Sequence, residues 1–441
     1  METATQQVER ALARLAQHDP GLNAFSVVLA ERARAEAAAL DALPEAERGP
    51  LHGVPMAIKE ELDVAGCVTT FGGEANTTPA AADAEVVRRL RAAGAVVVGK
   101  TTMPEFGAFP YTESASRGLT RNPWDRTRSP GGSSGGTAAA VAAGVVPVAM
   151  GGDGGGSIRI PAAFCGLFGL KPQRGRVTTA PHEHLWWALG TVGPLSRTVL
   201  DSARVYDVIR GSLPVDRWHA GPTGSFADAA GLDPGRLRIG WSARPVAKGV
   251  RPDPLHVQVL HETARALAHL GHDVREVDPR YPDPTAAFVP QFFAGIRTEA
   301  QAVEHYERLE RRTRETYRLG SWVTPRVVEA AIRAGEQVER KANRVFDDVD
   351  VLMTPATAHR PPRVGVLDGR GTVAASLRSL PAIAYAALWN VAGNPAASVP
   401  CGVAEDGLPT AVQLVGRPDA ETTLVSLAAQ LERVRPFPVL A

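Results

Sequence analysis

Residues 131–172 have the sequence GGSSGGTAAAVAAGVVPVAMGGDGGGSIRIPAAFCGLFGLKP. Two glycine–serine clusters, 131–136 and 151–157, enclose a run of small apolar residues that predicts a helix followed by a buried strand. Glycine allows a positive φ and lets backbone N–H groups approach a ligand closely. Both clusters adjoin apolar segments, which is untypical of a flexible linker. They therefore indicate a pair of functional loops, either a phosphate cradle or an oxyanion hole.

Two common glycine-loop motifs fit this stretch poorly. A phosphate loop needs GxxxxGK[ST], and neither cluster has the lysine at that place. GxSxG occurs twice, centred on Ser133 and Ser134, as in the nucleophile elbow of α/β-hydrolases. The elbow requires a strand directly before the serine, whereas NPWDRTRSP at 122–130 is typical of a loop. The histidines that could complete such a triad stand in no motif: His219, His256, His272 and His359.

The bulk composition is that of a globular protein whose partner is a small or neutral molecule. The 441 residues are 44% hydrophobic and 22% charged, and the formal net charge is +1. Such a balance gives no bulk attraction to nucleic acid or to an anionic membrane. The start, METATQQVER, lacks the pattern of a signal peptide, and the longest apolar run, 138–150, is too short to cross a bilayer. Three widely separated cysteines without metal-ligand spacing suggest a reducing compartment, so we expect a cytoplasmic protein without a metal or cofactor.

Helix and strand patterns alternate along the chain, which is typical of an α/β fold. Strands are expected at 24–29, 54–62, 96–98, 145–150, 238–241, 349–354 and 412–415. Helices are expected at 5–17, 30–40, 83–93, 137–143, 256–270 and 424–431, with two or three more in 287–346. The sequence thus predicts a single domain over residues 1–441. Its core covers about 50–205 and 349–432, and a variable helical insertion covers about 210–345.

Several segments, taken in order, resemble the amidase signature family. Besides 131–172, HGVPMAIKEELD at 52–63 is similar to the family's G-V-P-x-x-I-K-D, and VVVGKTTMPEFG at 96–107 to G-K-T-N-x-x-E-F. Further similar segments are GPLSRTVLDSA (193–203), NVAGNPAASVP (390–400) and GLPTAVQLVGRP (407–418). The resemblance covers most of the chain and is least distinctive between about 205 and 345. It implies the amidase signature fold, a mixed sheet of about eleven strands flanked by helices.

The resemblance also implies catalytic roles for three side chains. They are the nucleophile Ser157, the proton relay Ser133, which in the family follows a cis peptide bond, and the base Lys59. In the family, backbone N–H groups just before the nucleophile form the oxyanion hole. In this sequence the corresponding groups belong to Gly154, Gly155 and Gly156. No metal or cofactor takes part in this chemistry.

The chemistry of amide cleavage needs these groups. A serine hydroxyl is a weak nucleophile at neutral pH and must be activated by a base. A lysine can accept a proton only in its neutral form, which burial in an apolar strand such as VPMAIK favours. We expect Asp153, Arg159 and Ser134 to support the nucleophile loop through ionic and hydrogen bonds.

This sequence departs from the family pattern at a few positions. Gly154 stands where the family has threonine, which could loosen the oxyanion hole or widen the acyl side, and Glu60 replaces an aspartate. Trp186 and Trp187 lie where many relatives have small residues. They either line an apolar pocket for an aryl or alkyl substrate or cap the core.

The sequence therefore predicts a hydrolase that cleaves a carboxamide C–N bond through an acyl-enzyme. One alternative is an aryl-amide, ester or carbamate (urethane) hydrolase, because the triad does not dictate the leaving group. Others are the glutamine-hydrolysing subunit of a tRNA-dependent amidotransferase and a binding protein without activity. The expected partner is a small-molecule amide or related acyl compound, bound by a monomer or homodimer.

Overall fold

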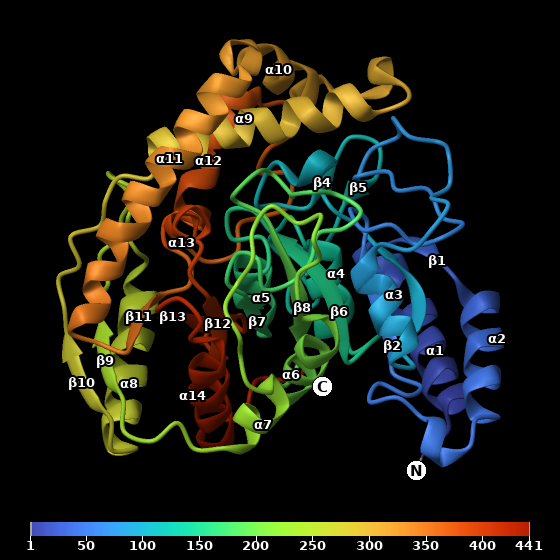
Figure 1. The fold of residues 1–441 in the computed structure, drawn as a ribbon, viewed down its shortest axis with the longest axis horizontal. Coiled ribbons are helices and arrows are strands. Elements are labelled where there is room, and N and C mark those ends of the chain that lie inside the picture. Colours follow the sequence, from blue (N-terminus) through green and yellow to red (C-terminus); the bar gives the residue numbers. More distant parts are fainter. Residues whose placement is uncertain (1, 441) are drawn as a thin grey trace.

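The computed structural model describes residues 2–440, and one eleven-stranded mixed sheet runs through it (Figure 1). The strand order is β1-β3-β2-β6-β8-β7-β12-β13-β11-β9-β10, which confirms the fold expected from the resemblance. The strands are β1 Phe25–Val28, β2 Pro55–Lys59, β3 Val96–Thr101, β6 Val148–Asp153, β7 Phe168–Lys171, β8 Thr191–Ser196, β9 Arg238–Trp241, β10 Asp273–Glu276, β11 Val351–Pro355, β12 Ala396–Val403 and β13 Pro409–Gly416. A separate pair consists of β4 Glu113–Ser114 and β5 Gly118–Leu119.

Strand direction places two predicted site residues at one edge of the sheet. β2 is parallel to both of its neighbours, β3 and β6, whereas β6 and β8 are antiparallel. The carboxyl ends of parallel strands meet at the same edge, where ligands commonly bind in α/β folds. Lys59 is the last residue of β2 and Asp153 the last of β6, so both lie at this edge.

Helices cover both faces of the sheet. One layer contains α3 Glu85–Ala92, α6 Val199–Ile209, α7 Phe226–Gly231, α8 Pro254–His269 and α14 Glu421–Val434. The other contains α1 Ala4–Leu22, α2 Ala30–Asp41, α4 Gly135–Ala142 and α5 Arg159–Cys165. A third group extends along the upper and left side of Figure 1: α9 Thr285–Ala302, α10 Arg311–Leu319, α11 Pro325–Ala342, α12 Thr372–Ile383 and α13 Ala387–Ala392. Short 3₁₀ turns lie at Glu45–Glu47, Glu105–Gly107, Tyr306–Arg308, Gly320–Trp322 and Asn343–Asp347.

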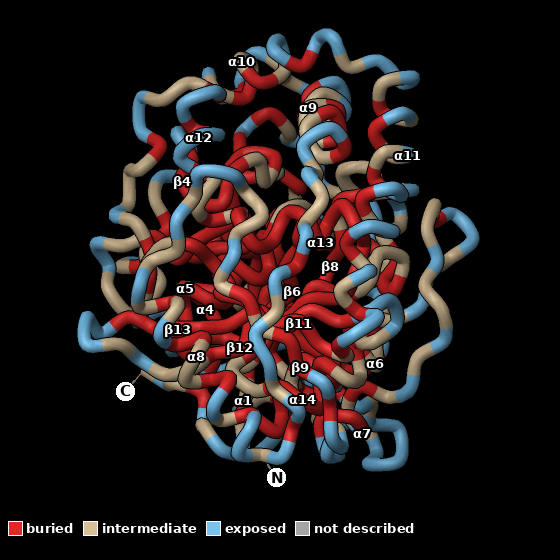
Figure 2. Tube along the Cα trace, turned by 90° about the vertical axis from the view of Figure 1, so that its left-hand side faces the viewer, coloured by how far each residue is buried: buried red, intermediate tan, exposed pale blue. Residues whose placement is uncertain are grey.

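The two faces of the sheet bury separate hydrophobic cores, and the alternation of side chains along β2 selects between them. Met56 and Ile58 pack into the core shared with α3, α6, α8 and α14. Ala57 packs into the core shared with α1, α2 and α4. Successive side chains of a strand point to opposite faces, so Lys59 lies on the Ala57 face, toward α4. Figure 2 shows that the centre of the molecule is almost continuously buried. Among residues 2–440 no helix has the length and apolar character needed to cross a bilayer.

The region 210–345 contains the expected helices, the strand expected at 238–241 and one strand that was not expected. It contains α7 to α11, but β9 and β10 also belong to it and complete one edge of the main sheet. β10 escapes prediction because DVRE lies at the edge of the sheet, with mostly exposed side chains and no apolar alternation.

The second glycine cluster also differs, because β6 continues through Gly152 to Asp153 instead of ending at Met150. The lack of side chains allows this: a Cβ on Gly151 would lie 2.8 Å from the Leu195 side chain.

Gly136 lets α4 approach the end of β3, and its substitution should loosen the fold next to the site. A Cβ on Gly136 would lie 2.5 Å from the backbone nitrogen of Thr102 and 2.6 Å from the oxygen of Ala24. We expect Gly136→Ala to lower the free energy of unfolding by about 1–3 kcal/mol in urea titration, as overpacking does. Gly231→Ala at the end of α7 is the matched control, because a Cβ there meets nothing within 4 Å. Equal stability of the two variants would contradict the close approach.

Candidate active site

Lys59 is the centre of a buried polar contact at the end of β2. Its side chain is only 1% exposed. Its Nζ donates a hydrogen bond to Ser133 Oγ at 2.8 Å and lies 3.0 Å from Glu61 Oε2. Ser133 belongs to the loop before α4, and the Gly132–Ser133 peptide bond is cis, as the resemblance led us to expect. Two of the three predicted catalytic side chains are therefore in direct contact.

Ser157 lies between β6 and α5 and is 8% exposed. Together with Lys59 and Ser133 it lines a cavity of about 780 Å³. Within residues 2–440 no hydrogen bond joins the hydroxyls of Ser133 and Ser157. Catalytic hydrogen bonds of this kind are often long in unliganded enzymes and shorten only when substrate binds. The structure thus brings the three predicted side chains to one cavity, with Ser133 already bonded to Lys59.

The glycines before Ser157 are not equivalent. The N–H of Gly156 donates to Asp153 Oδ1 at 2.6 Å, so the structure does not leave this group free for an oxyanion, contrary to our expectation. Gly154 and Gly155 line the cavity, and within residues 2–440 their N–H groups have no acceptor. Two of the three predicted oxyanion donors are therefore available.

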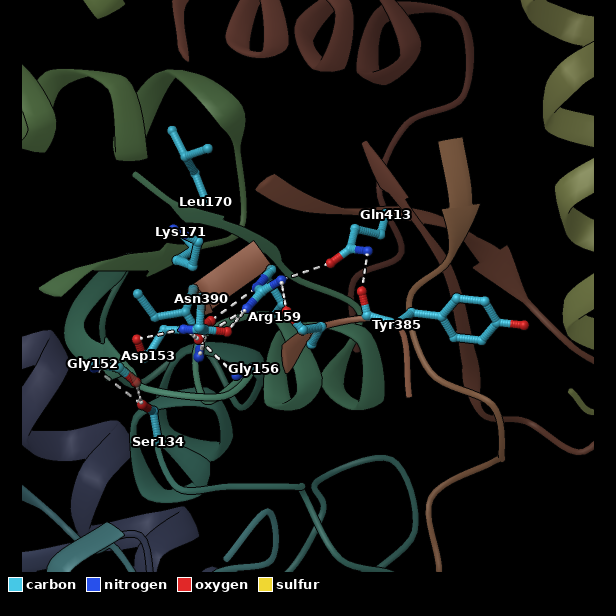
Figure 3. A network of polar contacts seen from close by, with 12 residues as sticks. Ser134, Gly152, Asp153, Gly156, Arg159, Leu170, Lys171, Tyr385, Asn390 and Gln413 are labelled. Carbon is cyan, nitrogen blue, oxygen red and sulfur yellow. Dashed lines mark hydrogen bonds and ion pairs between the residues drawn. The ribbon is translucent and has the colours of Figure 1, made fainter. Parts of the chain in front are cut away.

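A buried ion pair holds this loop (Figure 3). Arg159 is fully buried, and its Nε and Nη2 each lie 3.0 Å from one carboxylate oxygen of Asp153. Burial alone would raise the pKa of Asp153, but the charge and hydrogen bonds of Arg159 hold that pKa well below its usual range. Asp153 also accepts hydrogen bonds from the N–H groups of Gly156 and Ile158. The carboxylate therefore fixes the backbone on both sides of Ser157.

Two further side chains complete the network, and sequence reasoning assigned them no role. Asn390 donates from Nδ2 to Asp153 Oδ1 at 2.8 Å and accepts from Arg159 at 2.6 Å. Gln413 accepts from Arg159 Nη1 at 2.8 Å. The segments that contain them, 390–400 and 407–418, resemble the family, and this resemblance is the signal that could have pointed to both side chains.

Ser134 connects the two glycine–serine clusters. Its hydroxyl donates to Gly152 O at 3.1 Å, and its N–H donates to Ser157 O at 3.3 Å. Ser134 is fully buried and is not among the residues that line the cavity. This position suits support of the loops and not attack on a substrate.

The cavity walls are largely aromatic and aliphatic. Trp186 lines the cavity, and its indole lies edge-on to Phe292 of α9, with ring centroids 5.6 Å apart. The same indole covers Gly154, where a Cβ would lie 3.5 Å from the ring, so Trp186 fills the space next to the position where the family has threonine. Trp187 does not line the cavity and stacks on His184 at 4.4 Å. Only one of the two predicted tryptophans therefore faces the site.

Two acidic side chains also line the cavity, and the sequence analysis missed both of them. Glu61 Oε1 is buried and has no hydrogen-bond partner within residues 2–440. Glu299 projects from α9, where burial, and then the charge of Glu61, raise its pKa to about 7. Glu61 lies in the turn that follows β2, closed by the hydrogen bond from Leu62 N–H to Lys59 O at 3.0 Å, so no strand periodicity in the sequence places it beside Lys59.

Comparison with known proteins places this chain in a family. The amidase family model matches residues 6–425. The chain belongs to the amidase signature family. It is a hydrolase of carbon–nitrogen bonds. It is 50% identical over 439 residues to AmiB2 of Mycobacterium tuberculosis, a protein classed among the amidases, with 99% of this chain and 93% of that protein covered.

Solved structures of this family superpose closely on this amidase. A 6-aminohexanoate cyclic dimer hydrolase matches with a TM-score of 0.91 and 33% identity, covering 98% of this chain and 94% of that one. A bacterial aryl acylamidase of the amidase signature family matches with a TM-score of 0.88 and 28% identity, covering 99% and 94%. The family fold thus extends over nearly the whole amidase, including the region 210–345.

Replacing Asp153 should destabilise the amidase because it leaves the Arg159 guanidinium buried without its partner. We expect Asp153→Asn to cost about 3–5 kcal/mol of unfolding free energy near pH 7 in urea titration. Because the pKa of Asp153 is lowered in the folded state, its carboxylate stabilises the fold above its unfolded pKa, and this stabilisation is lost as pH falls below about 4. The difference in unfolding free energy between Asp153→Asn and wild type should therefore shrink at low pH. Glu9→Gln, which breaks an exposed pair with Arg34, should change stability little. A cost as small as that control's would contradict the role of the network.

Glu299 should make stability depend on pH in the opposite direction. Its folded pKa, about 7, lies above the ordinary value, so the folded state holds the proton more tightly. Its contribution is present below about pH 4.5 and is lost as pH rises through about 7. Glu299 should therefore lower the unfolding free energy of the wild type by on the order of 2 kcal/mol between pH 5 and pH 8, and we expect Glu299→Gln to lack this decrease. Glu276→Gln, on the exposed side of β10, should leave the slope unchanged, and a wild-type slope in Glu299→Gln would disprove the assignment.

Proposed function

We propose that this amidase cleaves a carboxamide through an acyl-enzyme on Ser157, with Ser133 as proton relay and Lys59 as base. The observation that carries the proposal is the 2.8 Å contact between Lys59 Nζ and Ser133 Oγ at the wall of a cavity that Ser157 also lines. The side chain of the base is buried in the cavity wall, with only 1% of it exposed.

Acylation begins when Ser157 Oγ attacks the carbonyl carbon of the amide. Its proton passes to Ser133 Oγ while the proton of Ser133 passes to Lys59 Nζ, so the relay hydroxyl keeps its hydrogen. The tetrahedral oxyanion accepts hydrogen bonds from the free N–H groups of Gly154 and Gly155, each worth about 3 kcal/mol in such a hole. The C–N bond then breaks as Lys59 returns the proton through Ser133 to the leaving nitrogen.

Deacylation repeats these steps with water. Lys59 and Ser133 take a proton from the water as its oxygen attacks the acyl carbon, and the same proton is returned to Ser157 Oγ. The carboxylic acid leaves, and the enzyme recovers its starting protonation. The Asp153–Arg159 network keeps Ser157 and the two glycines in place throughout.

The cavity favours an apolar acyl or leaving group. Trp186, Phe288 and Phe292 supply flat apolar surface beside the two free N–H groups. Such walls suit an anilide or alkyl amide, and an ester or carbamate with the same groups would meet the same machinery. A similar structure is that of an aryl acylamidase, which agrees with this substrate class.

We consider the glutamine-hydrolysing amidotransferase subunit a weaker alternative. The walls beside the two free N–H groups are aromatic, whereas glutamine with its charged head group would need polar partners there. We further propose that residues 1–441 act as one cytoplasmic domain, as a monomer or homodimer, without a partner subunit. Robust hydrolysis by the isolated chain would agree with this, whereas copurifying subunits would favour the amidotransferase.

Active-site labelling tests the mechanism. A fluorophosphonate should modify Ser157, located by peptide mass spectrometry, and Ser157→Ala should lose both labelling and turnover of p-nitrophenyl amides, anilides, esters and carbamates. Lys59→Ala and Ser133→Ala should each slow turnover by about 10³-fold or more. Ser321→Ala, an exposed serine outside the cavity, is the matched control. Labelling at Ser134, or full activity of Lys59→Ala, would refute the proposed triad.

A further inference from the structure

Glu61 occupies the side of Lys59 that Ser133 leaves open. The Lys59 ammonium nitrogen lies 2.8 Å from the serine oxygen and 3.0 Å from Glu61 Oε2. The other oxygen, Oε1, is buried against the strand that precedes the nucleophile, because a Cβ on Gly152 would lie within 2 Å of it. Glu61 therefore touches the base and the backbone of β6, but neither serine of the proposed triad.

The neighbouring Glu60 cannot serve in this place. It lies on the opposite side of the chain, where it accepts a hydrogen bond from Thr70 at 2.9 Å and lies 3.9 Å from Lys100 Nζ. A carboxylate is thus available to Lys59 only from Glu61 among the contacts of residues 2–440.

A carboxylate beside this amine has two effects of opposite sign. It stabilises the ammonium that forms when the relay delivers the nucleophile's proton, as the aspartate of a Ser-His-Asp triad stabilises the imidazolium. It also favours the ammonium in the resting enzyme, where Lys59 must be neutral to act. The first effect raises the rate of the chemical step, and the second raises the pH needed to reach that rate.

We propose that Glu61 is a positioning residue for Lys59 that extends the relay to Glu61–Lys59–Ser133–Ser157. This inference rests on the proposed role of Lys59 as the base. Glu61 orients Nζ toward Ser133 Oγ and balances the positive charge while the proton resides on Lys59. It keeps its own proton count through the cycle, so each proton taken from Ser157 still returns to the leaving nitrogen.

Other charged groups around Lys59 are already engaged or more distant. Asp153, on the same face of the sheet, is neutralised by Arg159. Lys100 and Glu60 form their own pair on the other face. Glu299, on α9, lies near enough to interact with the charge of Glu61 but makes no ion pair with Lys59 within residues 2–440. The contact of Glu61 with Lys59 is therefore the one whose removal should change the base.

Glu61→Gln separates the two effects because it keeps the shape and removes the charge. The rate of fluorophosphonate labelling of Ser157 and kcat/KM for a p-nitroanilide are measured from pH 5 to pH 10. We expect the maximal rate to fall about tenfold or more. The acid limb of the pH–rate profile, where activity declines toward low pH, should move to lower pH by about one unit or more. Glu61→Asp keeps the charge on a shorter side chain and should restore the wild-type position of the acid limb. Glu299→Gln is the matched control and should move the limb less than Glu61→Gln.

The measurements distinguish the role of Glu61 from the role of Lys59 as the base. A purely structural role of Glu61 would lower the rate, or the unfolding midpoint, without moving the acid limb, and that result would overturn the inference. An acid limb that moves to higher pH in Glu61→Gln would also overturn it. Full activity of Lys59→Ala in the same assays would instead refute the proposed base, whatever Glu61→Gln does.

Discussion

The ion pair between Asp153 and Arg159 is the constraint on which the rest of the site depends. Burying both charges away from water is expensive unless geometry and hydrogen bonding are complete. Here both carboxylate oxygens are engaged, and Asn390 and Gln413 of distant segments complete the guanidinium's partners. The pair joins the end of β6, the start of α5, α13 and β13 into one unit. The loop that carries Ser157 therefore has its conformation set by residues far apart in the sequence.

A second constraint is that the buried amine of Lys59 needs polar partners, and the geometry of the sheet provides them. The alternation of β2 sends Met56 and Ile58 into one core and leaves Lys59 on the other side, at the very end of the strand. There the amine meets Ser133 and Glu61 instead of hydrocarbon. Shifting the register of β2 by one residue would send its side chains to the other face and place the amine in the core around α3 and α6. The register of β2 is thus a functional requirement as well as a packing one.

Much of the fold and of the site could be predicted because short continuous segments of the sequence determine them. The glycine–serine clusters, the apolar strand ending in Lys59 and the spacing of Ser133 and Ser157 are all contained in short segments, and the eleven-stranded fold followed from the resemblance. The parts that escaped depend on contacts between segments. β10 is a polar edge strand whose identity comes only from pairing with β9, and the N–H of Gly156 is lost to a carboxylate three residues away. The phenylalanines of α9 have no motif, because their role comes from where the helix lies.

The packing of Trp186 over Gly154 ties the width of the cavity to the backbone of the nucleophile loop. A Cβ on Gly154 would lie 3.5 Å from the indole, which is ordinary van der Waals contact, so the ring packs directly over the loop. A side chain longer than alanine at 154 would extend toward the ring, and a smaller residue at 186 would widen the cavity beside the oxyanion donors. Divergence of substrate preference among related chains should therefore proceed by paired exchange at these two positions. A combinatorial library intended to retarget this enzyme gains more from varying 154 and 186 together than from saturating either one.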